Sequence, residues 1–230
     1  MHIKSVDSML SADQDAVMEA RSVHVAVYDT LADWEVGAAT AHISNGACHK
    51  EPGRYVIRTV GPSTQPITTM GGMRIVPDMA LADLAPADSA MLILPGAEGW
   101  ETDKLTAFAQ KAQEFVDAGV PVAAICGATF GLARQGLLDN RKHTSNMAEY
   151  LIASGYAGTE HYLDEPAVTD AGVITANSTA PFEFAREVLG ALDIYEPHVL
   201  DGWYRLFAFG DPAGYAVLAE YEAQQTADRP

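Results

Sequence analysis

Two kinds of hydrophobic pattern alternate along the chain. Short runs rich in apolar residues indicate strands, and the fully apolar ones are typical of parallel strands covered on both faces. These runs lie at residues 23–28, 55–60, 91–94 and 122–125. Between and after them, helical spacing and capping signals predict helices over residues 33–44, 105–119 and 182–192. Strands that alternate with helices predict an α/β fold with a mostly parallel sheet.

Glycine-containing turns add smaller elements to this frame. Gly71-Gly72 separates two short apolar runs at 66–70 and 73–77, which predicts a hairpin. A second hairpin is expected over 167–176, where Asp170-Ala171-Gly172 forms the turn. Two more helices are expected, one that follows Cys126 and ends near Gly136, and one over 146–153. The helix over 33–44 has three candidate N-caps, which are Asp29, Thr30 and Asp33.

Cys126 stands where a predicted strand breaks into a predicted helix, in the segment PVAAICGATFGLARQGLL. A sharp turn of this kind pushes the side chain outward and aims the free N–H groups of the helix at it. Such surroundings lower the pKa of a cysteine, and Gly127 permits the tight geometry. The alternative is a buried core cysteine. Because the loop at Gly96 and the residues after Tyr28 also follow strand carboxyl ends, where ligands bind in such sheets, we favour a reactive Cys126.

Composition and charge exclude several classes of function. The chain has 230 residues, of which 48% are hydrophobic and 20% charged, as in globular proteins. A net charge of −17 argues against nucleic acid and membrane surfaces as partners. The two cysteines, Cys48 and Cys126, imply no disulfide framework, and we expect a cytoplasmic protein. The N-terminal residues lack the apolar core of a signal peptide, and no run approaches the length of a membrane span.

Four segments together resemble the ThiJ/PfpI superfamily, which includes a parkinsonism-associated deglycase and has the class I glutamine amidotransferase-like fold. They are VHVAVYDTLADWEVG at 23–37, MLILPGAEGW at 91–100, AAICGATFGLARQGLLDNRKHTSN at 123–146 and VITANSTAPFEFAREVLGAL at 173–192. The resemblance implies a flavodoxin-like three-layer sandwich with a nucleophile-elbow cysteine. It divides the chain into an N-terminal lead-in at 1–22, a ThiJ/PfpI-like domain at 23–194 and a partly helical C-terminal extension with a frayed tail at 195–230. We expect this extension to be docked on the domain or to form an oligomer contact.

The resemblance also implies roles for individual residues. Cys126 matches the family's nucleophile, and Glu35 matches an acid that is hydrogen-bonded to it. A carboxyl group beside a thiolate should have a raised pKa, so that Glu35 could donate or accept a proton; the alternative is a solvated acid in the first turn of a helix. The family's glycine-rich loop corresponds to Gly96 and Ala97, whose amides, with that of Gly127, are candidates for an oxyanion hole.

Two further positions are candidates for substrate binding, and one feature of the family is missing. Trp100 could form a wall of the pocket or simply pack. Some relatives have a histidine directly after the cysteine or at the end of a TTH-like element, where this chain has Gly127 and Asn146. Asn146 could orient a substrate but cannot shuttle a proton. His143 lies three residues earlier, and its side chain could point elsewhere.

Three functions therefore remain open. The first is a cysteine-dependent hydrolase or lyase of glyoxalase, deglycase or hydratase type, acting on a small molecule through Cys126 and Glu35. The second is a redox-sensing stress protein that uses oxidation of Cys126. The third is a glutamine amidotransferase-like or peptidase-like enzyme, which lacks its usual histidine. No cofactor or metal is expected, since Cys48 and His49 alone make a poor metal site; a homodimer is implied by the resemblance.

Overall fold

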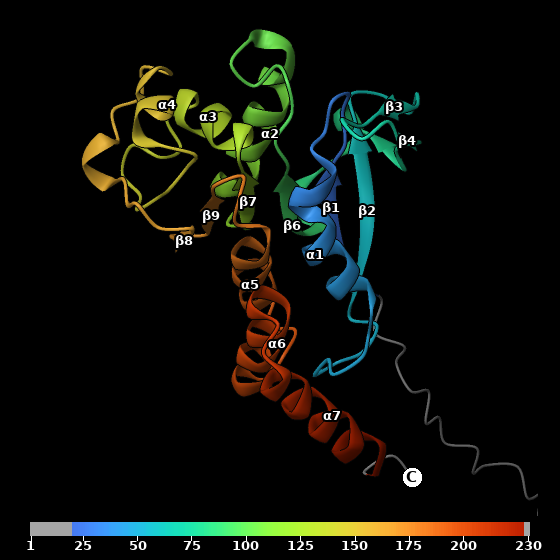
Figure 1. Cartoon of the computed structure of the whole chain (residues 1–230). Helices are drawn as coiled ribbons and strands as arrows, with labels where there is room; N and C mark the ends of the chain where they lie inside the picture. The colour runs from blue at the N-terminus through green and yellow to red at the C-terminus, as the bar shows by residue number, and fades with distance from the viewer. Residues whose placement is uncertain (1–19, 228–230) are drawn as a thin grey trace, which may run out of the picture.

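The computed structural model describes residues 20–227 (Figure 1). Most of the predicted lead-in and the last three residues of the predicted tail lie outside that range. The division of the chain into three parts thus stays a prediction.

A seven-stranded sheet forms the centre of the molecule, in the order β5-β2-β1-β6-β7-β9-β8. Its strands pair in parallel, except that β8 runs antiparallel to β9. The strands are β1 (Arg21–Ala26), β2 (Tyr55–Gly61), β5 (Met79–Ala80), β6 (Ser89–Leu94), β7 (Val122–Ile125), β8 (Ala167–Asp170) and β9 (Val173–Ala176). A separate antiparallel hairpin joins β3 (Ile67–Thr68) to β4 (Arg74–Ile75).

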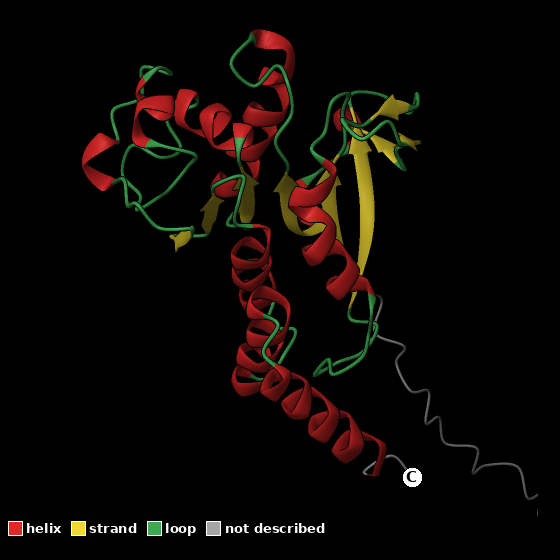
Figure 2. Ribbon diagram, in the orientation of Figure 1, coloured by secondary structure: helices red, strands yellow, loops and turns green. Residues whose placement is uncertain are grey.

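Helices cover both faces of this sheet (Figure 2). They are α1 (Asp33–Ser44), α2 (Thr106–Asp117), α3 (Gly127–Arg134), α4 (Ala148–Ile152), α5 (Pro181–Ala191), α6 (Pro197–Phe209) and α7 (Pro212–Ala227). Short 3-10 turns lie at Leu81–Asp83, Pro86–Asp88, Asp103–Leu105 and Thr159–His161. The result is the predicted three-layer α/β sandwich of flavodoxin-like type.

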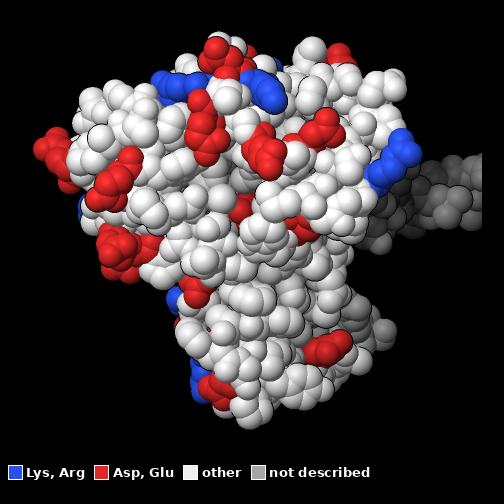
Figure 3. All heavy atoms as spheres, turned by 45° about the horizontal axis from the view of Figure 1, so that its top comes forward, with Lys and Arg blue, Asp and Glu red and all other residues white. Residues whose placement is uncertain are grey.

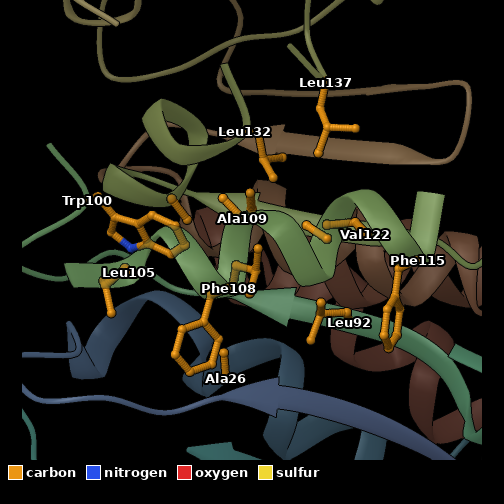
Figure 4. Close-up of a cluster of buried hydrophobic side chains, with 14 of the residues drawn as sticks. Ala26, Leu92, Trp100, Leu105, Phe108, Ala109, Phe115, Val122, Leu132 and Leu137 are labelled. Atoms are coloured by element: carbon orange, nitrogen blue, oxygen red, sulfur yellow. The ribbon is translucent and has the colours of Figure 1, made fainter. Parts of the chain in front are cut away.

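The side chains of the central strands explain why the sheet is covered on both faces. Leu92 and Leu94 of β6 belong to one hydrophobic cluster, whereas Met91 and Ile93 belong to the other. Successive residues of a strand point to opposite faces, so a run that is apolar throughout must be buried on both. Helices α2 and α3 fill the first cluster, part of which is shown in Figure 4. Helices α1, α5 and α6 fill the second.

The three candidate caps of α1 have other partners. The N-cap of the helix is Ala32, which makes no side-chain cap. The carboxylates of Asp29 and Asp33 accept the backbone N–H groups of Thr68 and Gly71, at 2.8 Å and 2.6 Å. The Thr30 hydroxyl accepts the N–H of Glu98 at 2.9 Å. The prediction of a side-chain cap was therefore wrong: these polar groups hold the β3–β4 hairpin and the loop after β6 instead.

The C-terminal segment, which sequence patterns left without defined elements, consists of α6 and α7. Figure 1 shows both helices continuing from α5 away from the sheet. Trp203 of α6 is 1% exposed and packs in the second cluster. Gly202 and Gly214 let the two helices approach closely, because a Cβ on Gly214 would lie 2.3 Å from the Gly202 carbonyl oxygen. Helix α6 is thus docked on the sandwich.

Candidate active site

The backbone at Cys126 turns sharply between β7 and α3. Its φ of 59° and ψ of −125° lie in a region that residues other than glycine rarely adopt. The Cys126 N–H bonds the Ala176 carbonyl at 3.0 Å, and the Thr129 hydroxyl donates to the Cys126 carbonyl at 2.6 Å. These bonds hold a conformation that costs about 1–3 kcal/mol on its own. The side chain is left partly accessible at the N-terminus of a helix.

Glu35, in the first turn of α1, is fully buried. Its Oε2 accepts the backbone N–H of Gly96 at 2.6 Å. Its Oε1 is buried and has no hydrogen-bond partner among the described residues. Glu35 is thus not the solvated first-turn acid of the alternative interpretation. One carboxylate oxygen is fixed by the loop after β6, and the other is free for a reacting group.

Gly96 brings Glu35 and Cys126 together. A Cβ placed on Gly96 would lie 2.8 Å from Glu35 Oε2 and 2.9 Å from Cys126 Sγ. Carboxyl and sulfur are therefore neighbours across one glycine, and no larger residue fits there. The Gly96 N–H donates its hydrogen bond to Glu35 Oε2, so the expectation that this amide faces an oxyanion was wrong.

The amide group of Asn146 lies on another side of the sulfur. Its Oδ1 accepts the N–H of Ser178 at 2.9 Å, which fixes the orientation of the amide. Nδ2 is therefore the group that faces Cys126 Sγ, at 3.6 Å. Asn146 is a hydrogen-bond donor to the sulfur, and the Gly127 N–H is a second one that favours the thiolate.

Burial and mutual repulsion govern the ionisation of the pair. Burial raises the pKa of Glu35 to about 7, against the lowering effect of the Gly96 N–H and the Cys126 thiol. Burial, followed by the Glu35 charge, raises the pKa of Cys126 to about 11, although Asn146 and Gly127 lower it. The expected lowering of the cysteine pKa was wrong, because burial disfavours the thiolate and the neighbouring Glu35 charge adds to that effect. Between about pH 7 and about pH 11, the pair therefore consists mainly of a carboxylate and a thiol.

A cleft of about 290 Å³ opens above this pair. The residues that line it are Ala32, Trp34, Glu35, Met70, Gly96, Ala97, Glu98, Gly99, Glu101, Cys126, Gly127, Asn146 and Tyr150. Trp100 is not among them: it is 1% exposed, and its indole N–H donates to the Pro95 carbonyl. Its ring fills the space beside Gly131 of α3, so it packs behind the elbow instead of forming a wall.

Histidine takes no part in the cleft lining among the described residues. His143 is fully buried. One ring nitrogen lies 2.7 Å from the Arg141 carbonyl and the other 3.1 Å from the Tyr156 hydroxyl. Its side chain therefore faces away from Cys126, and Glu35 is the titratable neighbour of the sulfur.

Sequence patterns missed seven of the thirteen residues that line the cleft, among them Trp34, Met70, Glu101 and Tyr150. Trp34 is 52% exposed and is anchored by a 3.1 Å bond from its indole N–H to the Ser178 carbonyl. Met70 comes from the turn of the β3–β4 hairpin, and Glu101 and Tyr150 meet across the mouth. Trp34 directly precedes Glu35 in the segment that resembles the family, and this position was the signal that could have identified it. Nothing in the local sequence links Glu101 to Tyr150, 49 residues away.

The second cysteine has a different setting. Cys48 is 6% exposed, and its Sγ faces the Leu218 carbonyl of α7 at 3.4 Å. Burial raises its pKa as well. The neighbouring His49 ring faces the His42 carbonyl instead. Cys48 therefore serves as an internal reference for the reactivity of Cys126.

Comparisons with known proteins agree with this architecture. The chain is 39% identical over 192 residues to YoaZ of Bacillus subtilis, described as an uncharacterised protease, covering 82% of this chain and 91% of that protein. It is 29% identical over 136 residues to a glutathione-independent glyoxalase of Caenorhabditis elegans, covering 58% of this chain and 71% of that protein.

A solved structure of a ThiJ/PfpI family protein from Bacillus anthracis superposes with a TM-score of 0.82 at 38% identity, covering 89% of this chain and 98% of that one. A DJ-1 superfamily protein of Agrobacterium tumefaciens gives 0.72 at 32% identity, covering 82% and 97%. The model of the DJ-1/PfpI family matches residues 21–191. The chain therefore belongs to the DJ-1/PfpI family.

Proposed function

We propose that the protein is a cysteine-dependent enzyme that acts on small, electrophilic carbonyl compounds in the manner of a glyoxalase. The observation that carries the proposal is the juxtaposition of Cys126 Sγ and the Glu35 carboxyl group across Gly96. A nucleophile beside a base of pKa about 7 is suited to proton transfer near neutral pH. The relative named as a glyoxalase points in the same direction.

The first step is addition of the thiol to the aldehyde carbon of a 2-oxoaldehyde. Glu35, as the carboxylate, accepts the Sγ proton while the S–C bond forms. The N–H of Gly127, at the N-terminus of α3, and the Asn146 amide stabilise the developing alkoxide. The Ala97 amide, on the cleft-lining loop, is the second backbone donor that we assign to this role.

The remaining steps need only proton transfers and water. Glu35 first returns the Sγ proton to the alkoxide, which gives a neutral hemithioacetal and restores the carboxylate. The carboxylate then takes the C1 proton to give an enediolate, and the O1 proton passes to O2. Glu35 delivers its proton to C2, which leaves a thioester of the 2-hydroxy acid. Water then cleaves the S–C bond and restores the thiol. The sum is a 2-oxoaldehyde plus water giving a 2-hydroxy acid, without an external oxidant. Hydration of a C≡N-like group by the same two residues is the related alternative.

A redox-sensing role is the second candidate, and one observation favours it. The unpartnered Oε1 of Glu35 lies in the same buried site as the sulfur and could, when protonated, donate to a sulfinate. Peptidase or amidotransferase chemistry has less support, because a cleft of about 290 Å³ holds a small molecule and no histidine lines it among the described residues. Because YoaZ is named as a protease, the experiment below also tests for peptidase activity.

The test is turnover of methylglyoxal to lactate, with nitrile, glutamine and casein as further substrates. We expect methylglyoxal turnover, lost in Cys126→Ser and reduced at least about 100-fold in Glu35→Gln, which lacks the base. Cys48→Ala is the matched control and should retain activity. Stoichiometric modification of Cys126 by peroxide without turnover of any substrate would favour the redox role instead.

Two associated predictions stand beside this proposal. A homodimer is still expected from the family resemblance, and a cytoplasmic location from the two cysteines, which imply no disulfide framework. Within residues 20–227, none of the helices has both the length and the apolar character needed to cross a membrane.

A further inference from the structure

The mouth of the cleft is spanned by a hydrogen bond between two segments distant in sequence. The Tyr150 hydroxyl, on α4, donates to Glu101 Oε1 in the loop after β6 at 2.6 Å. The Tyr150 ring packs against Phe130 of α3, with ring centroids 5.2 Å apart. Such a short bond to a carboxylate is strong, so the charge of Glu101 is held at a defined place on the cleft wall.

The charge of this cleft is one-sided. Glu35, Glu98 and Glu101 line it, and no lysine, arginine or histidine is among the lining residues that the structure describes. None of these three carboxylates forms an ion pair within residues 20–227. Figure 3 shows more acidic than basic side chains on the visible face when the top of Figure 1 is turned forward.

A second, independent feature points to a ligand at the same place. Glu35 is 0% exposed, and its Oε1 has no hydrogen-bond partner among the described residues. A buried polar atom without a partner is costly, so it is suited to bind a group that donates a hydrogen bond or carries positive charge. An incoming carboxylate would instead meet the buried charge of Glu35 and the exposed charges of Glu98 and Glu101, all of the same sign as its own.

We propose that the Glu101–Tyr150 pair makes this cleft selective for charge: it admits uncharged and cationic electrophiles to Cys126 and rejects those that carry a carboxylate. Glu101 supplies the charge, and Tyr150 is a positioning residue that holds it. This inference rests on the proposed function for its substrate class. It also implies that these negative charges repel the 2-hydroxy acid product, which is an anion, and so favour its release. The neutral substrate is not repelled.

Thiol alkylation tests this selectivity without requiring turnover. Iodoacetamide is neutral and iodoacetate is an anion of similar size; each forms an S–CH2 bond to Sγ and releases iodide, while the thiol proton passes to Glu35 or water. The rate constants at Cys126 are measured by peptide mass spectrometry with each reagent. Their ratio is divided by the same ratio for free glutathione, which corrects for the intrinsic reactivities of the reagents.

The variants separate the effect of the Glu101 charge from the effect of the shape of the cleft. Glu101→Gln keeps an acceptor for Tyr150 but removes the charge, and should lower the corrected iodoacetamide-to-iodoacetate ratio about tenfold. Tyr150→Phe should lower it less, because Glu101 stays charged but is no longer held. Glu149→Gln, an exposed acid of α4 outside the cleft lining, is the matched control and should leave the ratio unchanged. In the wild-type protein, 0.5 M salt should reduce the ratio towards that of glutathione.

The outcomes separate the two proposals. A corrected ratio that is the same in wild type and Glu101→Gln, with Cys126 reacting in both, would overturn the charge selectivity and leave the nucleophile intact. A Cys126 that reacts with neither reagent in the native protein would overturn the accessible nucleophile and, with it, both proposals. Selective alkylation without turnover of any carbonyl would support the charge selectivity and count against the glyoxalase.

Discussion

Glu35 and Cys126 are neighbours because Gly96 has no side chain: its missing Cβ would lie 2.8 Å from Glu35 Oε2 and 2.9 Å from Cys126 Sγ. The two residues come from α1 and from the β7–α3 elbow, and they meet because parallel strands end at one edge of the sheet. Most of the chemistry proposed for the protein depends on this contact.

Replacement of Gly96 by alanine should therefore separate the pair. The new methyl group must push away the carboxylate, the sulfur or both, and overpacking of this kind costs about 1–3 kcal/mol. We expect turnover to fall at least about 100-fold, since an ångström-scale displacement of reacting groups has that effect. Gly37→Ala is the control: the added Cβ meets nothing within 4 Å in the middle of α1, and it should be neutral or stabilising. Equal activity of the two variants would refute the close packing.

Glu35→Gln should make the protein more stable at alkaline pH. Burial raises the pKa of Glu35 in the folded protein from 4.5 to about 7. Between those values the folded state keeps a proton that the unfolded state has lost, so the stability contributed by Glu35 is complete below about pH 4.5 and is lost as the pH rises through about 7. The neutral amide avoids this loss, which is worth roughly 3 kcal/mol above pH 8.

Urea unfolding of wild type and Glu35→Gln at pH 5 and pH 8.5 measures this difference. The gap between the two proteins should be larger at pH 8.5 than at pH 5, in favour of the variant. The glutamine carbonyl can still accept the Gly96 N–H, so the comparison isolates the charge. A gap independent of pH would show that Glu35 has an ordinary pKa.

Asn146 should tune the sulfur through its amide donor. In Asn146→Asp, one carboxylate oxygen keeps the Ser178 N–H and the other faces Sγ as an anion. A negative charge there disfavours the thiolate, so the iodoacetamide rate constant at pH 9 should fall about tenfold or more. Asn146→Ala removes only the donor and should reduce the rate less. If alanine were the more damaging of the two, Asn146 would act mainly by packing.

Trp203 should prove to be part of the core and not only an oligomer contact. Its side chain is 1% exposed in the second hydrophobic cluster. Trp203→Ala should lower the free energy of unfolding by about 3–5 kcal/mol through loss of contacts and the cavity left behind. The loss should be the same at all protein concentrations in denaturant titrations. A loss seen only at high concentration would mean that α6 is stabilised through an oligomer.

The sheet was predictable because its strands carry their own signal. Met91 to Leu94 are apolar throughout, and that is sufficient to indicate a strand covered on both faces. Strand β5 is only two residues long, Met79–Ala80, and carries too little pattern to be found. Helix α7 was not defined because its apolar residues are not gathered on one face, so helical spacing does not mark it. Helix α6 does have an apolar face, with Val199 and Trp203 buried at helical spacing, and that signal was not used.

The site was predictable only in part, for a physical reason. Cys126 was proposed from local signals, and Glu35 was proposed from the family resemblance. Their pKa values depend on distances across the fold, which is why the sequence suggested a lowered pKa for Cys126 and the structure gives a raised one. The Gly96 N–H was assigned to an oxyanion for the same reason: its actual acceptor, Glu35, lies 61 residues away.

The measurement that tests the central claim most directly is the rate of iodoacetamide alkylation of Cys126 against pH, in wild type and Glu35→Gln, with Cys48 as internal reference. If Glu35 is the base for the thiol, the wild-type rate should rise with an inflection near pH 7, where Glu35 ionises. It should rise a second time at higher pH, where the thiol itself ionises. Glu35→Gln should lose the inflection near pH 7 and keep only the later rise. A single inflection near pH 8.5 in both proteins would contradict the account, because Cys126 would then be an ordinary thiol that ionises independently of Glu35.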